Sequence, residues 1–178
     1  MLGEETTKAL NHFGERVVID SKKNLKKKNK IASSSLINSI SYKAKVSKNS
    51  FELDFFMEDY WEFVDYGVKG VGGSKADRSR WKTKRVTNNK FKYKDKRPPI
   101  IAFNGWTIKK GIAPRSKGGQ FQKRRGLLFA IANSVYHTGL ETTSFFTKPF
   151  DKEFKELPDE IVEAYAIDVE ELLEFAIK

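Results

Sequence analysis

Five carboxylates lie close together in the sequence: Asp54, Glu58, Asp59, Glu62 and Asp65. Clustered carboxylates bind the divalent ions that many nucleases use. Asp54, however, belongs to a stretch in which polar and apolar residues alternate, so neighbouring side chains point to opposite faces of a strand. Nothing in the spacing brings the five groups to one point, and we rank a metal-dependent nuclease below the two binding functions considered next.

Few other residues suit catalysis. The chain has no cysteine and only two histidines. His12 lies on the shoulder of a predicted helix, where a surface role is expected, and His137 lies near a helix end whose dipole favours a cation. The stretch GVGGSK, residues 70–75, lacks the residue order of a phosphate-binding loop and suits a glycine hinge. We therefore predict a protein that is not an enzyme and that binds no cofactor.

Basic and aromatic residues are mixed between residues 68 and 140, where Trp81, Phe91 and Tyr93 stand among lysines and arginines. Lysines neutralise phosphates and aromatic rings stack on bases, so this pattern is typical of nucleic-acid contacts. An acidic face of a protein partner would satisfy the same charges, and both interpretations stay open. The predicted contact residues are Lys82, Lys84, Arg85, Lys90, Lys92, Lys94, Arg97, Arg115, Lys117, Arg124 and Arg125.

Charge is separated along the chain. The formal net charge of +11 divides into +7 for residues 1–50, −6 for 51–67, +17 for 68–140 and −7 for 141–178. Surfaces of opposite sign favour binding to a polyanion, or head-to-tail self-association in which an acidic face meets the basic face of a neighbour. An aromatic, acidic segment at residues 59–66 directly precedes the basic stretch. We expect either that the two are halves of one contact between subunits or that the basic stretch reaches a neighbouring ring.

Length and composition indicate a small globular protein. A chain of 178 residues is long enough for one domain with its own core. No apolar run approaches the roughly 20 residues of a membrane span. The first residues lack the basic start and apolar middle of a signal peptide. We expect a soluble protein that is not secreted.

Hydrophobic periodicity predicts the first elements. Leu10, Phe13, Val17 and Leu25 recur at helical spacing and predict a helix over residues 6–28, with Thr6 or Thr7 as its cap. Apolar residues then alternate with polar ones over residues 40–46 and again over 51–57. The polar turn SKNS separates these stretches, which predicts an antiparallel hairpin with one buried face.

The rest of the chain reads as loops and helices. Residues 58–67 fit a short helix or a strand, 68–99 a long loop with or without short strands, 100–111 a short helix, and 126–139 a largely buried helix ending at Gly139. A last helix begins or kinks at Pro158, with an apolar stripe of Ile161, Tyr165, Leu172 and Ala176. We predict an α+β fold in which residues 1–67 and 141–178 form one core domain and residues 68–140 a basic insertion.

Three segments, in order, resemble a known family. SSSLINSISYKAKV (33–46) is similar to the TG-x-L-x-x-SI start of the first strand in the neck and tail-completion proteins of tailed bacteriophages. YWEFVDYGVKG (60–70) resembles the family's YA-x-x-VE-x-GT segment, and TSFFTKPFDKEF (143–154) its P-x-x-FLRPAF segment. The resemblance covers somewhat more than half of the chain. The basic stretch 68–140 is much longer than the link that the family has there.

The resemblance implies a virion structural protein without catalytic residues. Such a protein forms a homo-oligomeric ring at the head–tail connector, the neck or the tail, and the DNA channel passes through the ring. Its partners would be portal, adaptor or tail proteins, with non-specific contact to genomic DNA and no membrane. The alternative is a free nucleic-acid-binding protein that uses the basic insertion. The residues predicted at the subunit interface are Tyr60, Trp61, Phe63, Asp65, Tyr66, Phe146 and Phe150.

Overall fold

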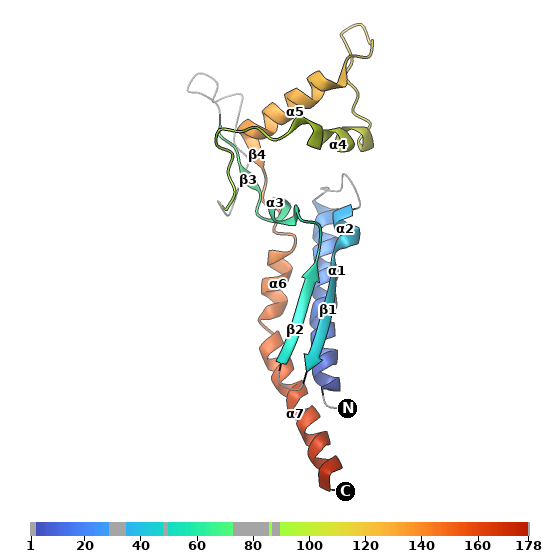
Figure 1. Cartoon of the computed structure of the whole chain (residues 1–178), viewed down its shortest axis with the longest axis vertical. Helices are drawn as coiled ribbons and strands as arrows, with labels where there is room; N and C mark the ends of the chain where they lie inside the picture. The colour runs from blue at the N-terminus through green and yellow to red at the C-terminus, as the bar shows by residue number, and fades with distance from the viewer. Residues whose placement is uncertain (1–2, 29–34, 48–49, 73–85, 87–89, 178) are drawn as a thin grey trace. The chain divides into compact units, whose positions relative to one another are not determined.

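The protein contains helices and two small antiparallel sheets, which confirms the α+β class (Figure 1). The computed structural model describes residues 3–28, 35–47, 50–72, 86 and 90–177. The chain divides into two compact units, unit 1 with residues 1–29, 35–58 and 145–178, and unit 2 with residues 30–34 and 59–144. The predicted division into a core domain of residues 1–67 and 141–178 and an insertion of residues 68–140 stays a prediction.

Unit 1 begins with a long helix that packs on a hairpin. Helix α1 spans Glu4–Lys27, the short α2 spans Ser35–Ser39, and strands β1 and β2 span Ser41–Ser47 and Ser50–Phe56. The strands pair antiparallel, with Ser41 opposite Phe56 and Ser47 opposite Ser50. The predicted first helix and hairpin are confirmed. Helices α6 (Thr147–Phe154) and α7 (Leu157–Ile177) complete the unit (Figure 1).

Aromatic side chains fill the core of unit 1. Phe13 of α1 is 1% exposed, and its ring meets Phe55 of β2 and Phe150 of α6 edge to face at 6.3 and 5.7 Å. This is the geometry that ring quadrupoles favour. Helix α1 approaches the hairpin closely at Gly14, where a Cβ atom would lie 2.5 Å from the ring of Tyr42. The close packing of α1 on the hairpin therefore depends on glycine at position 14.

Helix α7 runs antiparallel to α1, but its buried residues differ from the predicted stripe. Ile161 packs against the core, whereas Tyr165 and Leu172 are 48% and 47% exposed. The buried positions are instead Leu157, Ala164 and Asp168, and the side chain of Ala176 lies outside the described part. The prediction failed because the side of α7 that faces α1 carries Leu157, Ala164 and Asp168, and the turns of α7 after Asp168 lie beyond the first turn of α1, which begins at Glu4.

Asp168 caps the first turn of α1 from the other end of the sequence. Its carboxylate accepts hydrogen bonds from the backbone N–H groups of Glu5 and Thr6, both at 3.0 Å, and from the Thr6 hydroxyl at 2.7 Å. The predicted caps, Thr6 and Thr7, are themselves inside the helix. Burial raises the pKa of the Asp168 carboxyl, but the bonds from Thr6 and the first backbone N–H groups outweigh burial and lower it.

A second polar cluster ties the three long helices of unit 1 together. Arg16 of α1 contacts the carboxylates of Glu153 in α6 at 2.8 Å and of Glu160 in α7 at 3.0 Å. Glu153 is 3% exposed. A hydrogen bond from Lys152 lowers the pKa of Glu153 against the opposing effect of burial, and the charge of Arg16 lowers it further. Arg16 thus fixes the position of α6 and α7 along α1.

Unit 2 is built around a short ladder. It contains α3 (Trp61–Asp65), β3 (Val68–Lys69), the 3₁₀ helix η1 (Ile100–Phe103), α4 (Asn104–Lys109), α5 (Arg124–Thr138) and β4 (Gly139–Leu140). Strand β3 pairs with β4 antiparallel and bridges to Lys92 in parallel. Residues 58–67 therefore contain a helix, and the 68–99 stretch contributes a strand. Gly139 ends α5 with a φ of 80°, as predicted.

Helix α5 is less buried than predicted. Leu128 and Ala132 are its buried residues, and Phe129 is 50% exposed. Its apolar run has no clear helical period, so the sequence did not distinguish a buried helix from one that exposes apolar side chains. Among the described residues, no helix is both long enough and apolar enough to span a membrane.

The cap at Asp168 gives a stability prediction. Asp168→Ala removes three hydrogen bonds and leaves donors of α1 without their partner, so we expect the free energy of unfolding to fall by about 1–3 kcal/mol. Glu163→Ala, at an exposed acid in the middle of the same helix, should change it by less than about 0.5 kcal/mol. Urea unfolding followed by circular dichroism measures both variants, and equal losses would contradict the capping role.

The same measurement has a pH dependence. Because folding lowers the pKa of Asp168 below its ordinary value of 3.8, ionised Asp168 stabilises the protein at pH values above 3.8. That contribution is lost as the pH falls through the folded-state pKa. The stability difference between the wild type and Asp168→Asn should therefore be largest near neutral pH and shrink in acid.

Candidate interaction groove in unit 2

A groove of about 760 Å³ lies within unit 2. It has the size of a typical ligand or peptide site. Its walls come from α3, β3, the 90–94 stretch, a proline pair, η1 and β4. The residues that line this "unit 2 groove" are Phe63, Val68, Lys90, Phe91, Lys92, Tyr93, Lys94, Pro98, Pro99, Ala102, Phe103 and Leu140.

Backbone pairing with β3 positions the lysine wall. The N–H of Lys69 donates to Phe91 O and the N–H of Tyr93 donates to Lys69 O, both at 2.9 Å. This extended pairing makes side chains alternate, so Phe91 and Tyr93 are half-buried while Lys92 and Lys94 are exposed. Burial raises the pKa of the Tyr93 phenol. The groove therefore combines an apolar floor with a cationic edge.

Two glycines allow this ladder to close. A Cβ atom at Gly70 would lie 2.2 Å from the carbonyl oxygen of His137, and one at Gly139 would lie 2.3 Å from the carbonyl oxygen of Val68. Both clashes involve backbone, which cannot move aside. On the other flank, the Thr142 and Thr143 hydroxyls donate to the carbonyls of Tyr66 and Val64 at 2.7 and 2.6 Å. The end of α3 is thereby fixed beside β4.

The acidic, aromatic segment meets the basic stretch inside one chain. Lys90 Nζ lies 2.7 Å from Glu62 Oε1 and 4.7 Å from the centroid of the Tyr66 ring. The hydrogen bond to Glu62 raises the pKa of Lys90. The rings of Phe63 and Phe91 are 4.6 Å apart. At these residues the contact that we expected between two subunits is formed within a single subunit.

The predicted interface residues fall into three groups. Tyr60 and Phe63 are 40% and 45% exposed, while Trp61 and Tyr66 are half-buried with ring centroids 6.4 Å apart. A partner can therefore contact these four side chains only at their solvent-exposed atoms.

Asp65 is different, because its side chain is 1% exposed and its carbonyl accepts bonds from the Thr143 and Ser144 N–H groups. It is a structural residue, and we remove it from the predicted interface. Phe146 and Phe150 belong to unit 1, where their rings lie 5.3 and 6.0 Å from Phe55. Their interface role stays a prediction.

The predicted basic contact residues are also dispersed. Lys90, Lys92 and Lys94 line the groove, but Lys90 is engaged by Glu62. Lys82, Lys84 and Arg85 lie outside the described residues. The exposed Arg97 guanidinium lies 5.4 Å from the Phe129 ring centroid and 5.8 Å from that of Tyr136.

The remaining cations belong to the region around α4 and α5. The guanidinium of Arg115 lies 4.4 Å from the Phe121 ring centroid, and both residues are exposed together with Lys117 and Arg125. Arg124 is half-buried, 3.4 Å from the Thr107 hydroxyl. Arg97 and Arg115 thus each lie against an aromatic ring in a cation–π arrangement.

Three of the five carboxylates considered for metal binding have a basic partner or are buried. Glu62 pairs with Lys90, Asp54 lies 3.6 Å from Lys45, and Asp65 is buried. Within the described ranges no group of three or more His, Cys, Asp or Glu residues is placed to hold a metal ion. His12 is exposed. The His137 ring lies with Nδ1 2.7 Å from the Gly72 carbonyl oxygen, in addition to its place at the end of α5.

Sequence reasoning missed half of the groove. The apolar wall from Val68, Pro98, Pro99, Ala102, Phe103 and Leu140 comes from four separate parts of the chain. One signal was present: the pair Pro98–Pro99 ends the basic loop and is followed directly by the apolar run Ile100–Phe103. A proline pair marks a turn or loop, and an apolar run directly after it indicates side chains that pack against another part of the protein.

The ladder that forms the groove gives a second prediction. Gly70→Ala places a methyl group against the backbone at His137, so we expect a loss of about 1–3 kcal/mol in the free energy of unfolding. Gly126→Ala in α5 meets nothing within 4 Å and should raise it by about 0.5–1 kcal/mol because alanine favours a helix. Chemical unfolding of both variants tests this, and a neutral Gly70→Ala would refute the close approach.

Comparisons of the chain with protein families, with curated proteins and with solved structures found no match. No relative therefore supplies a function, and the assignment rests on the residues and their geometry.

Proposed function

We propose that the protein is a structural subunit of a tailed-bacteriophage virion. In this proposal copies of the chain form a ring at the head–tail connector, the neck or the tail, through which the DNA channel passes. The order of segments supports it: a long helix, a hairpin, the VD-x-G segment and the FF-x-KPF segment before the last helix follow each other as in the family that the sequence resembles.

The observation that carries the proposal is the separation of charge between the two units. Unit 1 contains 14 lysines and arginines and 17 aspartates and glutamates, a net charge of −3. Unit 2 contains 20 and 6, a net charge of +14. A head-to-tail contact between copies would bring these opposite charges together. Contacts of this kind generate rings when the rotation closes.

Exposed apolar side chains on both units support the same function. Helix α7 of unit 1 exposes Val162 at 70% and Leu173 at 56%, and unit 2 exposes Ile101 at 70% and Phe121 at 71%. Large exposed apolar groups beside charged ones are typical of surfaces that become covered on assembly. The remaining cations of unit 2 would face the channel and touch phosphates without reading bases.

Native mass spectrometry of the purified chain tests the proposal. We expect a closed oligomer of one copy number at low ionic strength, and a shift toward the monomer as salt screens the contact between units of opposite charge. The chain should also be present in purified virions at a constant ratio to the portal protein. A monomer at all concentrations, together with absence from virions, would contradict the proposal.

A second function, a free nucleic-acid-binding protein, is favoured by the charge of +14 on unit 2 and by the Arg97 and Arg115 pairs with aromatic rings. It predicts binding of the monomer to short duplex DNA with an affinity that falls steeply with salt.

Fluorescence anisotropy measures that binding. Lys92→Glu with Lys94→Glu should weaken it at least about tenfold if unit 2 is the footprint, because two phosphate contacts become repulsive. Lys26→Glu with Lys27→Glu, exposed on α1 in unit 1, changes the net charge equally and serves as the control. Equal losses in both variants would indicate general attraction instead of a site, and no binding by the monomer would exclude this function.

A further inference from the structure

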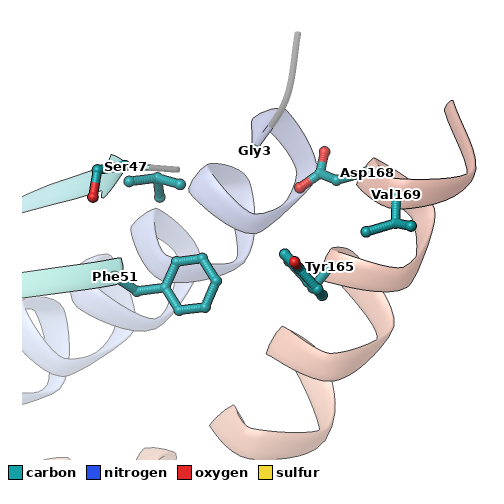
Figure 2. Close-up of a pocket in the computed structure, with 7 residues that line it drawn as sticks. Gly3, Ser47, Phe51, Tyr165, Asp168 and Val169 are labelled. Carbon is teal, nitrogen blue, oxygen red and sulfur yellow. The ribbon is translucent and has the colours of Figure 1, made fainter. Parts of the chain in front are cut away.

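The last turns of α7 extend beyond the body of unit 1. Asp168 sits against the first turn of α1 (Figure 2), and α7 continues to Ile177. These nine further residues are roughly 14 Å of helix at the usual rise, and they pass the end of α1 (Figure 1). A helix end of this length cannot be covered by α1, which begins at Glu4.

This helix end is both apolar and acidic. Leu172 and Leu173 are 47% and 56% exposed, and with Val169 they occupy positions i, i+3 and i+4 of one helix face. Glu170 and Glu171 are exposed between them. Val169 also lines a small pocket with Gly3, Phe51 and Tyr165 (Figure 2). Such spacing is typical of a helix that lays its apolar face into a groove on a partner.

The unit 2 groove has the complementary chemistry. Its floor contains Phe91, Tyr93 and Phe103, and its edge carries the exposed Lys92 and Lys94. Because Lys90 is paired with Glu62, the other two lysines are the cations that a bound helix would meet. An acidic peptide with bulky apolar side chains fits this surface.

We propose that the C-terminal end of α7 from one copy of the chain docks into the unit 2 groove of a second copy. Leu172 and Leu173 would cover the aromatic floor, and Glu170, on the flank of that helix face, would lie beside Lys92 and Lys94. The inference rests on the proposed self-association and names the contact that links neighbouring subunits.

Disulfide trapping tests this contact, because the wild-type chain has no cysteine. One variant carries Leu173→Cys and the other Ala102→Cys, an exposed residue of the groove wall, and their tags differ in mass. The two variants are mixed and oxidised, and the yield of mixed dimer is compared with that of a control mixture of Leu173→Cys and Gln120→Cys. We expect at least about tenfold more mixed dimer from the first mixture, because docking raises the effective concentration of the two thiols. Gln120 is exposed and does not line the groove. Thermal melts confirm that each variant is folded, and Lys92→Cys is a second groove position.

Charge exchange provides the matched measurement. Glu170→Lys should reduce the mixed dimer to the level of the control pair, and Lys92→Glu with Lys94→Glu in the groove-bearing partner should restore it. Three results would each overturn the inference. The mixed dimer could form only at the level of the control pair, or the charge exchange could fail to restore it. The third is a cross-link within one chain when both cysteines are in the same molecule. A closed ring in native mass spectrometry without trapping would reject this contact alone, whereas trapping without a closed oligomer would reject the ring and keep the contact.

Discussion

The hydrogen bonds between the Asp168 carboxylate and the first turn of α1 fix the layout of unit 1. They close the N-terminal end of a 24-residue helix that has no side-chain cap of its own, and they set the register at which α7 passes α1. Arg16 fixes the same pair of helices further along, through Glu153 and Glu160. Because both anchors lie before residue 169, the acidic and apolar end of α7 extends past the contacts that hold α7 to α1.

In unit 2 the corresponding constraint is the ladder at Lys69. Strand β3 pairs with the 90–94 stretch along one edge and with β4 along the other. The close approach of these backbones requires glycine at positions 70 and 139. This arrangement turns a lysine-rich stretch into one wall of an apolar groove. It also brings Lys90 to Glu62, so the aromatic, acidic segment stabilises the fold of its own chain before any partner binds.

Local patterns predicted the local structure. The period of two around SKNS and the spacing of Leu10, Phe13 and Val17 specify the hairpin and α1, because each pattern has one buried face. Contacts between distant residues were not predictable in this way. Asp168 is 162 residues from Thr6, and nothing in α7 distinguishes it from the surrounding acids. The groove was not predicted: Lys90, Lys92 and Lys94 stand out by charge as contact residues, but Val68, Ala102 and Leu140 are ordinary apolar residues until the ladder brings them together.

The most direct test of a self-assembling subunit with complementary charged units is a cryo-electron microscopy map of the purified chain at low ionic strength. We expect a ring with one rotational symmetry, in which the end of α7 from each copy contacts Lys92 and Lys94 of the next copy. A map of isolated monomers, or a ring in which the end of α7 and the unit 2 groove both face solvent, would contradict it.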